Sequence, residues 1–412
     1  MAKGNRSVFI LLLVLSGAII SICMGLRQSL GLFMRPMAVD TGISAATFGF
    51  AIALQNIVWG LAQPFVGAAA DRYGPRPVLV GTAVLYASGL VLMAFSQGEM
   101  ALDIAGFLLG VGTAGTAFGV LMGVVTRATP ESRRSQTVGL VAAAGSLGTM
   151  VLAPLGQAMI NAFGWHAALL AFAGIAASMV VLALPIKGIA TQLGADAPAR
   201  TARVQGLGAA LREALGHRGY LCMTLAFFAC GFQLVFITTH LPAYLQLCGV
   251  NPGVSATALG LIGLFNTIGT WCFGQLGARY SQKRLLALIY LLRTLFICVF
   301  LWTPISAAST LVFAAAMGML WLGVSPLVTG ILGRVFGLSH FGTLYGVVFL
   351  SHQVGSFLGA WMGGVVYART GSYDAAWAAL VAVGLTAFTL QWLMDDRPPA
   401  EIRRGAGAMA AA

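Results

Sequence analysis

The chain has 412 residues, of which 59% are hydrophobic and only 8% are charged. Soluble domains carry about 25% charged residues, so this composition excludes an ordinary soluble protein and indicates a membrane protein. Long apolar runs that contain Gly and Pro favour membrane-spanning helices over a barrel of alternating strands.

Twelve apolar segments are predicted to span the membrane, because each is long enough to cross about 30 Å of hydrocarbon at about 1.5 Å per residue. The first is too long for the apolar region of a signal peptide, and no small-residue cleavage pattern follows it, so we interpret it as a span. In chain order the spans cover residues 8–34, 46–68, 77–96, 101–124, 136–160, 165–186, 219–245, 254–277, 284–302, 307–332, 342–366 and 373–394.

The longest connection, residues 187–218, is rich in Ala, Gly, Thr and Arg and is predicted to be a linker, with a short surface helix around Gly206–Leu215. It separates an N-terminal six-span half, 1–186, from a C-terminal six-span half, 219–394. A tail of residues 395–412 follows the last span.

The basic residues predict the orientation of the spans. With the N-terminus inside, nineteen of the 23 Lys and Arg residues fall on inner segments, and only Arg35 and Arg369 fall on outer ones. By the positive-inside rule, both termini are expected in the cytoplasm, and we expect a bacterial inner-membrane protein. The net charge of +12 is thus a topology signal, and no nucleic-acid partner is needed to explain it.

The acidic residues avoid the interior of the spans. All eleven Asp and Glu residues fall at or near the two predicted membrane surfaces. A transporter that exchanges protons for cations needs a buried carboxylate to hold each in turn, because ionisable groups inside a membrane mark such pathways. The distribution therefore disfavours a cationic substrate.

A charged segment that begins at Gly67 and reads G-A-A-A-D-R-Y-G-P-R lies between the second and third spans. We expect a short loop at the membrane surface, in which Gly67 and Gly74 permit a tight turn. Asp71, Arg72 and Arg76 are the only charged residues between positions 41 and 98.

A weaker copy of this segment occurs 207 residues later, which indicates two related halves. The matching pairs are Gly67 and Gly274, Arg72 and Arg279, and Tyr73 and Tyr280. The pattern resembles the signature loop between helices 2 and 3 of the major facilitator superfamily of secondary transporters. That resemblance implies an all-α membrane fold of twelve helices in two pseudo-symmetric six-helix halves. It also implies a gating role for Gly67, Asp71, Arg72, Gly74, Arg76 and Arg279.

Within the superfamily, the chain resembles the bacterial monocarboxylate and oxalate–formate porter branch. The resemblance rests on Gly25–Pro36, Gly355–Gly359 and Gly371–Asp374. Porters of that branch typically place an arginine on span 8, four residues after an Asp or Asn. Here Asn266 is present but the later position is Thr270, so we expect a shifted clamp formed by Arg27 and His352.

Two residues inside the spans are the leading candidates for substrate binding. Arg27, in span 1, could clamp a carboxylate with its planar fork. Alternatively, it lies close enough to the outer surface to extend its guanidinium there. His352, near the middle of span 11, could donate to an anion and titrate near neutral pH. Its alternative role is a neutral histidine bonded to a neighbouring helix.

Other polar residues in the C-terminal spans are further candidates. Arg293 lies deep in span 9, but spans 3, 6, 9 and 12 of the superfamily usually support the outside of the bundle, so a structural pairing is equally compatible. Span 7 is the pseudo-symmetric partner of span 1 and offers two polar side chains. The remaining binding candidates are Gln233, His240, Asn266 and Gln353, with Gln55, Asn56, Gln63 and Ser351 as weaker ones.

Enzyme signatures are absent from the sequence. It contains no phosphate-binding G-x-x-x-x-G-K-[ST], no H-E-x-x-H, no G-x-S-x-G and no C-x-x-C pair. We therefore expect no enzymatic activity, no cofactor and no metal site, and we interpret the six cysteines as small buried hydrophobic residues.

The sequence thus predicts a monomeric secondary transporter in the lipid bilayer that moves a small organic anion, best described as a monocarboxylate, by alternating access. Coupling to protons through His352 and transport of an anion that carries its own proton both stay open. Efflux of a neutral or amphiphilic compound is the alternative, because the glycines and Pro154 of span 5 resemble a feature of exporters. A receptor that transports nothing is a remote alternative, since only 18 residues follow the last span.

The orientation is tested with reporter fusions placed after Pro198 and after Gln97. The charge distribution predicts that the first reports the cytoplasmic side and the second the outer side. The reverse pattern would overturn the topology and every assignment of an inner or outer surface.

Overall fold

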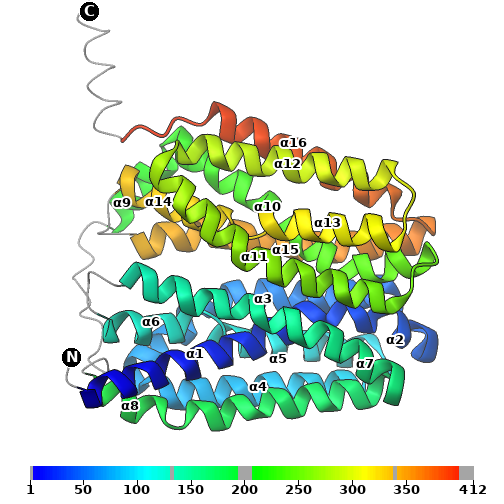
Figure 1. The fold of residues 1–412 in the computed structure, drawn as a ribbon, viewed down its shortest axis with the longest axis horizontal. Helices are drawn as coiled ribbons and strands as arrows, with labels where there is room; N and C mark the ends of the chain where they lie inside the picture. Colours follow the sequence, from blue (N-terminus) through cyan, green and yellow to red (C-terminus); the bar gives the residue numbers. More distant parts are fainter. Residues whose placement is uncertain (1–2, 130–133, 194–206, 337–340, 399–412) are drawn as a thin grey trace, which may run out of the picture.

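The computed structural model describes residues 3–129, 134–193, 207–336 and 341–398, and these fold into helices joined by short turns (Figure 1). Parts of the predicted linker (194–206) and tail (399–412) lie outside the described residues. The N-terminal helices occupy one side of the bundle in Figure 1, and α9–α16 occupy the other. The helices run nearly side by side along the long axis of the molecule.

In the N-terminal half, the first span is continuous from α1 through a 3₁₀ turn, and the fifth and sixth spans form one element with a break at Gly164 (φ 80°). The elements are α1 (Lys3–Ser29), η1 (Leu30–Phe33), α2 (Met34–Thr41), α3 (Ala45–Tyr73), α4 (Pro75–Ala94), α5 (Glu99–Thr116), α6 (Gly119–Ala128), α7 (Arg134–Ala183) and α8 (Ile186–Gln192).

The C-terminal half repeats this order after a short helix, α9, which lies where the sequence predicted one. The elements are α9 (Leu207–Leu215), α10 (Arg218–Leu247), α11 (Pro252–Arg279), α12 (Gln282–Trp302), α13 (Ala307–Leu320), α14 (Val324–Phe336), α15 (Phe341–Thr370) and α16 (Asp374–Leu393).

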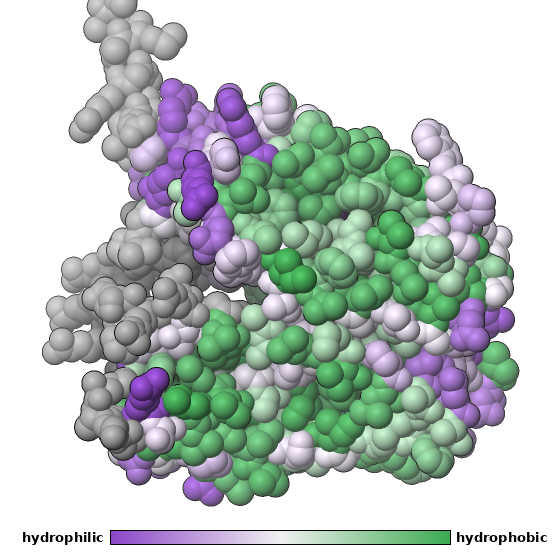
Figure 2. All heavy atoms as spheres, in the orientation of Figure 1, coloured by the Kyte–Doolittle hydropathy of each residue, from purple (hydrophilic) through white to green (hydrophobic). Residues whose placement is uncertain are grey.

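The dimensions and surface of the bundle suit a membrane. Ten stretches of the described chain are long and apolar enough to cross one. One of these, Ala143–Gln192, contains the two spans that meet at Gly164, and the 30-residue helix α15 completes the twelve. Figure 2 shows a hydrophobic surface over the middle of the bundle, with hydrophilic residues gathered at its two ends. Such a belt is expected where lipid tails are the solvent.

Spans 4 and 10 depart from the prediction, because each consists of two helices with a break between them. In span 4, α5 ends at Thr116 and α6 begins at Gly119; in span 10, α13 ends at Leu320 and α14 begins at Val324. Backbone groups freed at a break inside a membrane must find other partners.

Side chains from neighbouring helices satisfy these freed groups. Gln63 of α3 donates to the carbonyl of Ala114 (3.1 Å) beside the break in span 4. In span 10, Arg293 of α12 donates to the carbonyls of Leu320 and Trp321, while Asn266 of α11 accepts from the Leu322 N–H (2.9 Å). The breaks are thus fixed by tertiary hydrogen bonds.

Glycines allow equivalent helix pairs in the two halves to approach closely. A Cβ atom added to Gly148 of α7 would lie 1.8 Å from the carbonyl oxygen of Ser21 in α1, and one added to Gly231 of α10 would lie 1.9 Å from that of His352 in α15. Small residues at such contacts let helix backbones pack without intervening side chains.

The two halves meet through a second set of close contacts. A Cβ atom on Gly49 of α3 would approach the carbonyl of Ala360 in α15 to 2.6 Å, and one on Gly263 of α11 would approach that of Ser146 in α7 to the same distance. Gly31 in η1 lies against the backbone of Thr238 in α10. Residues of both halves therefore line the space around η1 and the middle of α3.

These contacts predict different effects for two glycine substitutions in α7. Gly148→Ala should lower stability by about 1–3 kcal/mol, as overpacking does, because the added methyl group meets backbone that cannot move aside. Gly174→Ala is the matched control, since an added Cβ there has no neighbour within 4 Å. Thermal unfolding of the detergent-solubilised variants measures the difference, and equal midpoints would contradict this description of the contact between α1 and α7.

Candidate functional site

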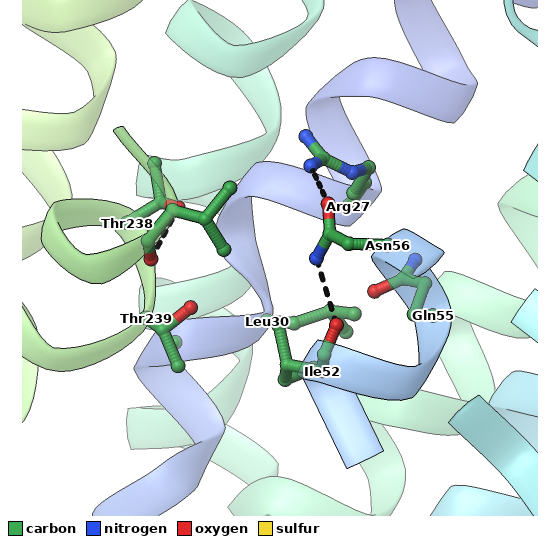
Figure 3. Close-up of a pocket in the computed structure, with 9 residues that line it drawn as sticks. Arg27, Leu30, Ile52, Gln55, Asn56, Thr238 and Thr239 are labelled. Atoms are coloured by element: carbon green, nitrogen blue, oxygen red, sulfur yellow. Dashed lines mark hydrogen bonds between the residues drawn. The ribbon is translucent and has the colours of Figure 1, made fainter. Parts of the chain in front are cut away.

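A small pocket lies where the two halves meet (Figure 3). Its walls come from α1, η1 and α3 of the N-terminal half and from α10 of the C-terminal half. No Asp or Glu is among its lining residues. The residues around it are Arg27, Leu30, Gly31, Ile52, Gln55, Asn56, Val235, Thr238 and Thr239.

Arg27 stands in the last turn of α1, and its guanidinium points into the bundle (Figure 3). Its Nη2 donates to Oδ1 of Asn56 on α3, and its Cζ lies 5.0 Å from the centroid of the Trp59 ring. Its Nε is buried and has no partner among the described residues. The guanidinium is therefore held within the bundle, and it keeps unused hydrogen-bonding capacity.

The 3₁₀ turn of η1 follows directly after this arginine and carries the contact with the other half. A Cβ atom at Gly31 would lie 2.1 Å from the carbonyl oxygen of Thr238, so only glycine fits there. A 3₁₀ stretch inside a longer helix often marks a functional hinge. The turn places Arg27 at the boundary between the halves.

The two adjacent amides of α3 differ in their bonding. Both polar atoms of the Asn56 side chain have a partner, since Oδ1 accepts from Arg27 and Nδ2 donates to the carbonyl of Ile52 (2.7 Å). Gln55 has no exposed surface, and neither its Nε2 nor its Oε1 has a partner within the described chain. An unsatisfied buried polar group costs about 1–3 kcal/mol, so the pocket favours a polar occupant. The sequence signal for both residues is two neighbouring amides at mid-depth in an otherwise apolar span.

His352 lies outside the pocket but is connected to it. Its Nδ1 lies 3.1 Å from Oε1 of Gln353, and Nε2 of Gln353 donates to the main-chain carbonyl of Asn56 (2.8 Å). The imidazole packs against Phe227 and Phe349, with ring centroids 5.0 and 5.9 Å away. A chain of hydrogen bonds thus joins His352 to Arg27 across the two halves.

The structure places four other predicted binding residues outside the pocket. Gln233 donates to the carbonyl of Leu380 in α16 (3.1 Å), and His240 has its Nε2 2.6 Å from the carbonyl oxygen of Ala360. Asn266 and Arg293 bind the backbone at the break in span 10, as described above. Asn266 also donates to Oγ of Ser146 in the other half (2.7 Å).

The predicted loop at residues 67–76 is shorter than expected. α3 continues to Tyr73 and α4 begins at Pro75, so the turn is confined to Gly74, whose φ of 86° suits a residue without a side chain. Asp71 lies 3.6 Å from the guanidinium of Arg127 at the end of α6, and Arg72 lies over the ring of Tyr73. The segment therefore ties the end of α3 to α6, the second piece of broken span 4.

Metal-binding clusters are absent from the part of the chain that the structure describes, since no three His, Cys, Asp or Glu side chains gather there. The six cysteines form no disulfide, and only Cys248 is exposed. Cys23 and Cys230 are buried, as expected for small hydrophobic residues.

The family model of the Major Facilitator Superfamily matches residues 9–359. The chain belongs to the Major Facilitator Superfamily. It is therefore a multi-pass membrane transporter and not an enzyme, and the prediction of an all-α fold with twelve spans in two halves is confirmed. The solved structure of the nucleoside transporter NupG has the same fold, with a TM-score of 0.75 at 13% identity over 94% of this chain and 99% of that one.

Relatives within the superfamily confirm the branch resemblance. Monocarboxylate transporter 13 of Rattus norvegicus is 26% identical over 85% of this chain and 81% of its own length. The oxalate:formate antiporter of Oxalobacter formigenes is 24% identical over 96% of this chain and 92% of its own. The uncharacterised transporter YcxA of Bacillus subtilis is 26% identical over 88% and 89% respectively.

The contact between Asp71 and Arg127 predicts the effect of Asp71→Asn. The variant should slow turnover severalfold with little change in equilibrium substrate binding, because the pair joins two helix ends far from the pocket. The partly exposed pair contributes little to stability, so the protein should still fold. Uptake rates and binding are measured on the same preparation, and loss of binding with normal turnover of the bound fraction would exclude a gating role.

Proposed function

We propose that this transporter carries a small organic anion with one carboxylate, and that Arg27 binds that carboxylate. The observation that carries the proposal is the spare hydrogen-bonding capacity of Arg27 and Gln55 in a pocket with no acidic lining residue. A carboxylate would accept from the guanidinium fork and from the Gln55 amide. The hydroxyls of Thr238 and Thr239, from the other half, would contact the rest of the molecule.

Electrostatics favours an anion over a cation at this position. At an effective dielectric constant of about 20, two like charges about 4 Å apart repel by about 4 kcal/mol. An anion instead gains a charge-assisted hydrogen bond, which contributes about 1.5–3 kcal/mol. The single arginine of the pocket also suits one carboxylate better than two, because a second would have no cationic partner there.

The names of the relatives support the same class of substrate. One is a monocarboxylate transporter, and another exchanges oxalate for formate, so carboxylates are the common element.

We propose that this transporter moves its anion by alternating access, in which the two halves rock about the pocket between them. We further propose a monomer in a bacterial inner membrane with both termini in the cytoplasm, and His352 as the titrating group if protons are coupled.

The glycines and proline of span 5, on which the efflux alternative rests, also have a packing role. Gly148 and Pro154 of span 5 lie at contacts between helices. Gly148 packs against α1, and Pro154 packs against Gly260 of α11. Tight contacts with two helices explain these residues without an exporter function.

Substitution of the arginine tests the proposal. Arg27→Gln should weaken binding of acetate, pyruvate or lactate by about 10- to 100-fold, since each 1.4 kcal/mol is about tenfold. Arg27→Lys should recover only part of this affinity, because the planar fork is lost. Arg369→Gln, at an exposed helix end, is the matched control and should bind like wild type. Uptake of radiolabelled anion into proteoliposomes provides the readout, and full anion transport by Arg27→Gln or robust transport of an organic cation would contradict the proposal.

A second substitution tests the role of the histidine. His352→Ala should reduce transport, and it should flatten the dependence of uptake on pH between about 5 and 8 if the imidazole carries the coupled proton. Ser351→Ala on the same helix is the control, because its hydroxyl bonds only within the C-terminal half (2.7 Å to the Thr224 carbonyl). An unchanged pH profile in His352→Ala would exclude this histidine as the proton carrier.

A further inference from the structure

Asn56 takes part in two contacts that belong to different functions. Its side chain accepts from Arg27 at the pocket, and its main-chain carbonyl accepts from Nε2 of Gln353 in the other half. Gln353 has no exposed surface, and its bond to Asn56 measures 2.8 Å. One residue of α3 therefore connects the proposed anion site with the interface between the halves.

The contact between Gln353 and α3 depends on the relative placement of the two helices. Gly60 makes room for it, since a Cβ atom there would lie 2.8 Å from Cγ and 3.0 Å from Cβ of Gln353. The side chain thus lies directly on the α3 backbone and reaches the carbonyl one turn earlier. A movement that separates α3 from α15 must break this hydrogen bond.

The carbonyl of Asn56 fixes the orientation of the Gln353 amide, and the amide in turn fixes the tautomer of the neighbouring histidine. Because Nε2 of Gln353 donates to Asn56, its Oε1 must accept, and the group that faces Oε1 is Nδ1 of His352 (3.1 Å). Nδ1 therefore carries the proton in this arrangement. The backbone of His352 is held as well, since its carbonyl accepts from Oγ of Ser356 (2.9 Å). Gln353 is thus held at both ends of its amide group.

We propose that Gln353, acting through Asn56, couples occupancy of the Arg27 site to the separation of α3 from α15. The inference rests on the proposed function, because it takes a carboxylate as the ligand of Arg27. A carboxylate is a stronger acceptor for a guanidinium than an amide oxygen is, so a bound anion competes with Asn56 for Arg27. Oδ1 of Asn56 then loses its donor inside the bundle, and the side chain must reorient to find another.

An anion that takes Arg27 therefore removes one of the two hydrogen bonds that hold this point of α3 in place, so that only the bond to Gln353 is left to oppose separation from α15. Binding and separation therefore favour one another, and linkage makes the effect reciprocal. A variant that lacks the hydrogen bond between the halves should already populate the separated state without ligand. Such a variant should bind the anion more tightly, whereas a merely structural lesion leaves affinity unchanged or lowers it.

The test measures the affinity of acetate, pyruvate and lactate for purified full-length variants. Gln353→Leu, which keeps the volume but not the hydrogen bond, should bind the tightest of these probes about two- to tenfold more tightly than wild type, as expected for loss of one hydrogen bond. Gly60→Ala should act in the same direction from the other helix, because its methyl group displaces the Gln353 side chain. It keeps the test decisive if Gln353→Leu does not fold. Ser351→Ala is the matched control on α15 and should bind like wild type.

A second readout follows the separation itself. Spin labels at Ser44→Cys, before α3, and Ser372→Cys, after α15, report the distance between these helix ends in a background without native cysteines. Ligand-free Gln353→Leu should show the longer distances that wild type shows only with the probe bound. Unchanged affinity and unchanged distances in both Gln353→Leu and Gly60→Ala would overturn the coupling.

The outcomes separate this inference from the proposed function. If Arg27→Gln abolishes binding but the interface variants bind like wild type, the anion site stands and the coupling is wrong. If Arg27→Gln binds all three carboxylates as wild type does, the proposed anion site is wrong, and the coupling that rests on it is wrong as well. If the interface variants bind the anion more tightly, and this gain disappears when Arg27→Gln is added, the anion site and the coupling are both supported.

Discussion

The positive charge of Arg27 is the constraint on which the central part of this transporter depends. Among the described residues it forms no ion pair, and only an amide oxygen and the face of Trp59 stabilise it. A charge in such surroundings is costly and must face water, a partner or a ligand. The pocket around it, the glycine contact at Gly31 and the unsatisfied amide of Gln55 all lie where α1, η1 and α3 meet α10.

The second arginine inside the spans makes an instructive contrast. Arg293 is fully buried and donates through Nε and Nη2 to two carbonyls at the break in span 10, while its Nη1 has no partner among the described residues. Arg293 therefore holds the backbone at that break, and it is absent from the lining of the pocket. By the 207-residue offset it corresponds to Tyr86, whereas Arg27 corresponds to Leu234. The two halves share their helix order but place their charges differently. In our account, the N-terminal half supplies the anion site, and the C-terminal half supplies hydroxyls and the contact through Gln353.

The sequence predicted the fold well because the fold follows from strong local signals. The length of the apolar segments predicts the twelve spans, and the repeated charged segment predicts the two halves. The breaks in spans 4 and 10 were missed, because they depend on Gln63, Asn266 and Arg293, which reach across from other helices. No feature of spacing along one segment reveals such tertiary hydrogen bonds.

The site was only partly predictable for a related reason. Arg27 stands out in the sequence because a charge in an apolar run is rare, and the structure places it beside a pocket. Gln233 and His240 also stood out, but α10 is buried on nearly all sides, so its sequence does not tell which face meets the other half. The structure turns Gln233 toward α16 and leaves Thr238 and Thr239 at the pocket. Gln55 is only a weak candidate in the sequence, because the absence of a hydrogen-bond partner is visible only in three dimensions.

The most direct measurement of the central claim locates a bound anion. A crystal structure with a brominated monocarboxylate, such as bromoacetate or bromopropionate, gives the position of the bromine from its anomalous scattering. We predict one strong peak in the pocket, with the carboxylate within hydrogen-bonding distance of Arg27 and close to Gln55 and Thr238. A peak beside Arg293, or no peak inside the bundle in a protein that demonstrably transports the compound, would contradict it.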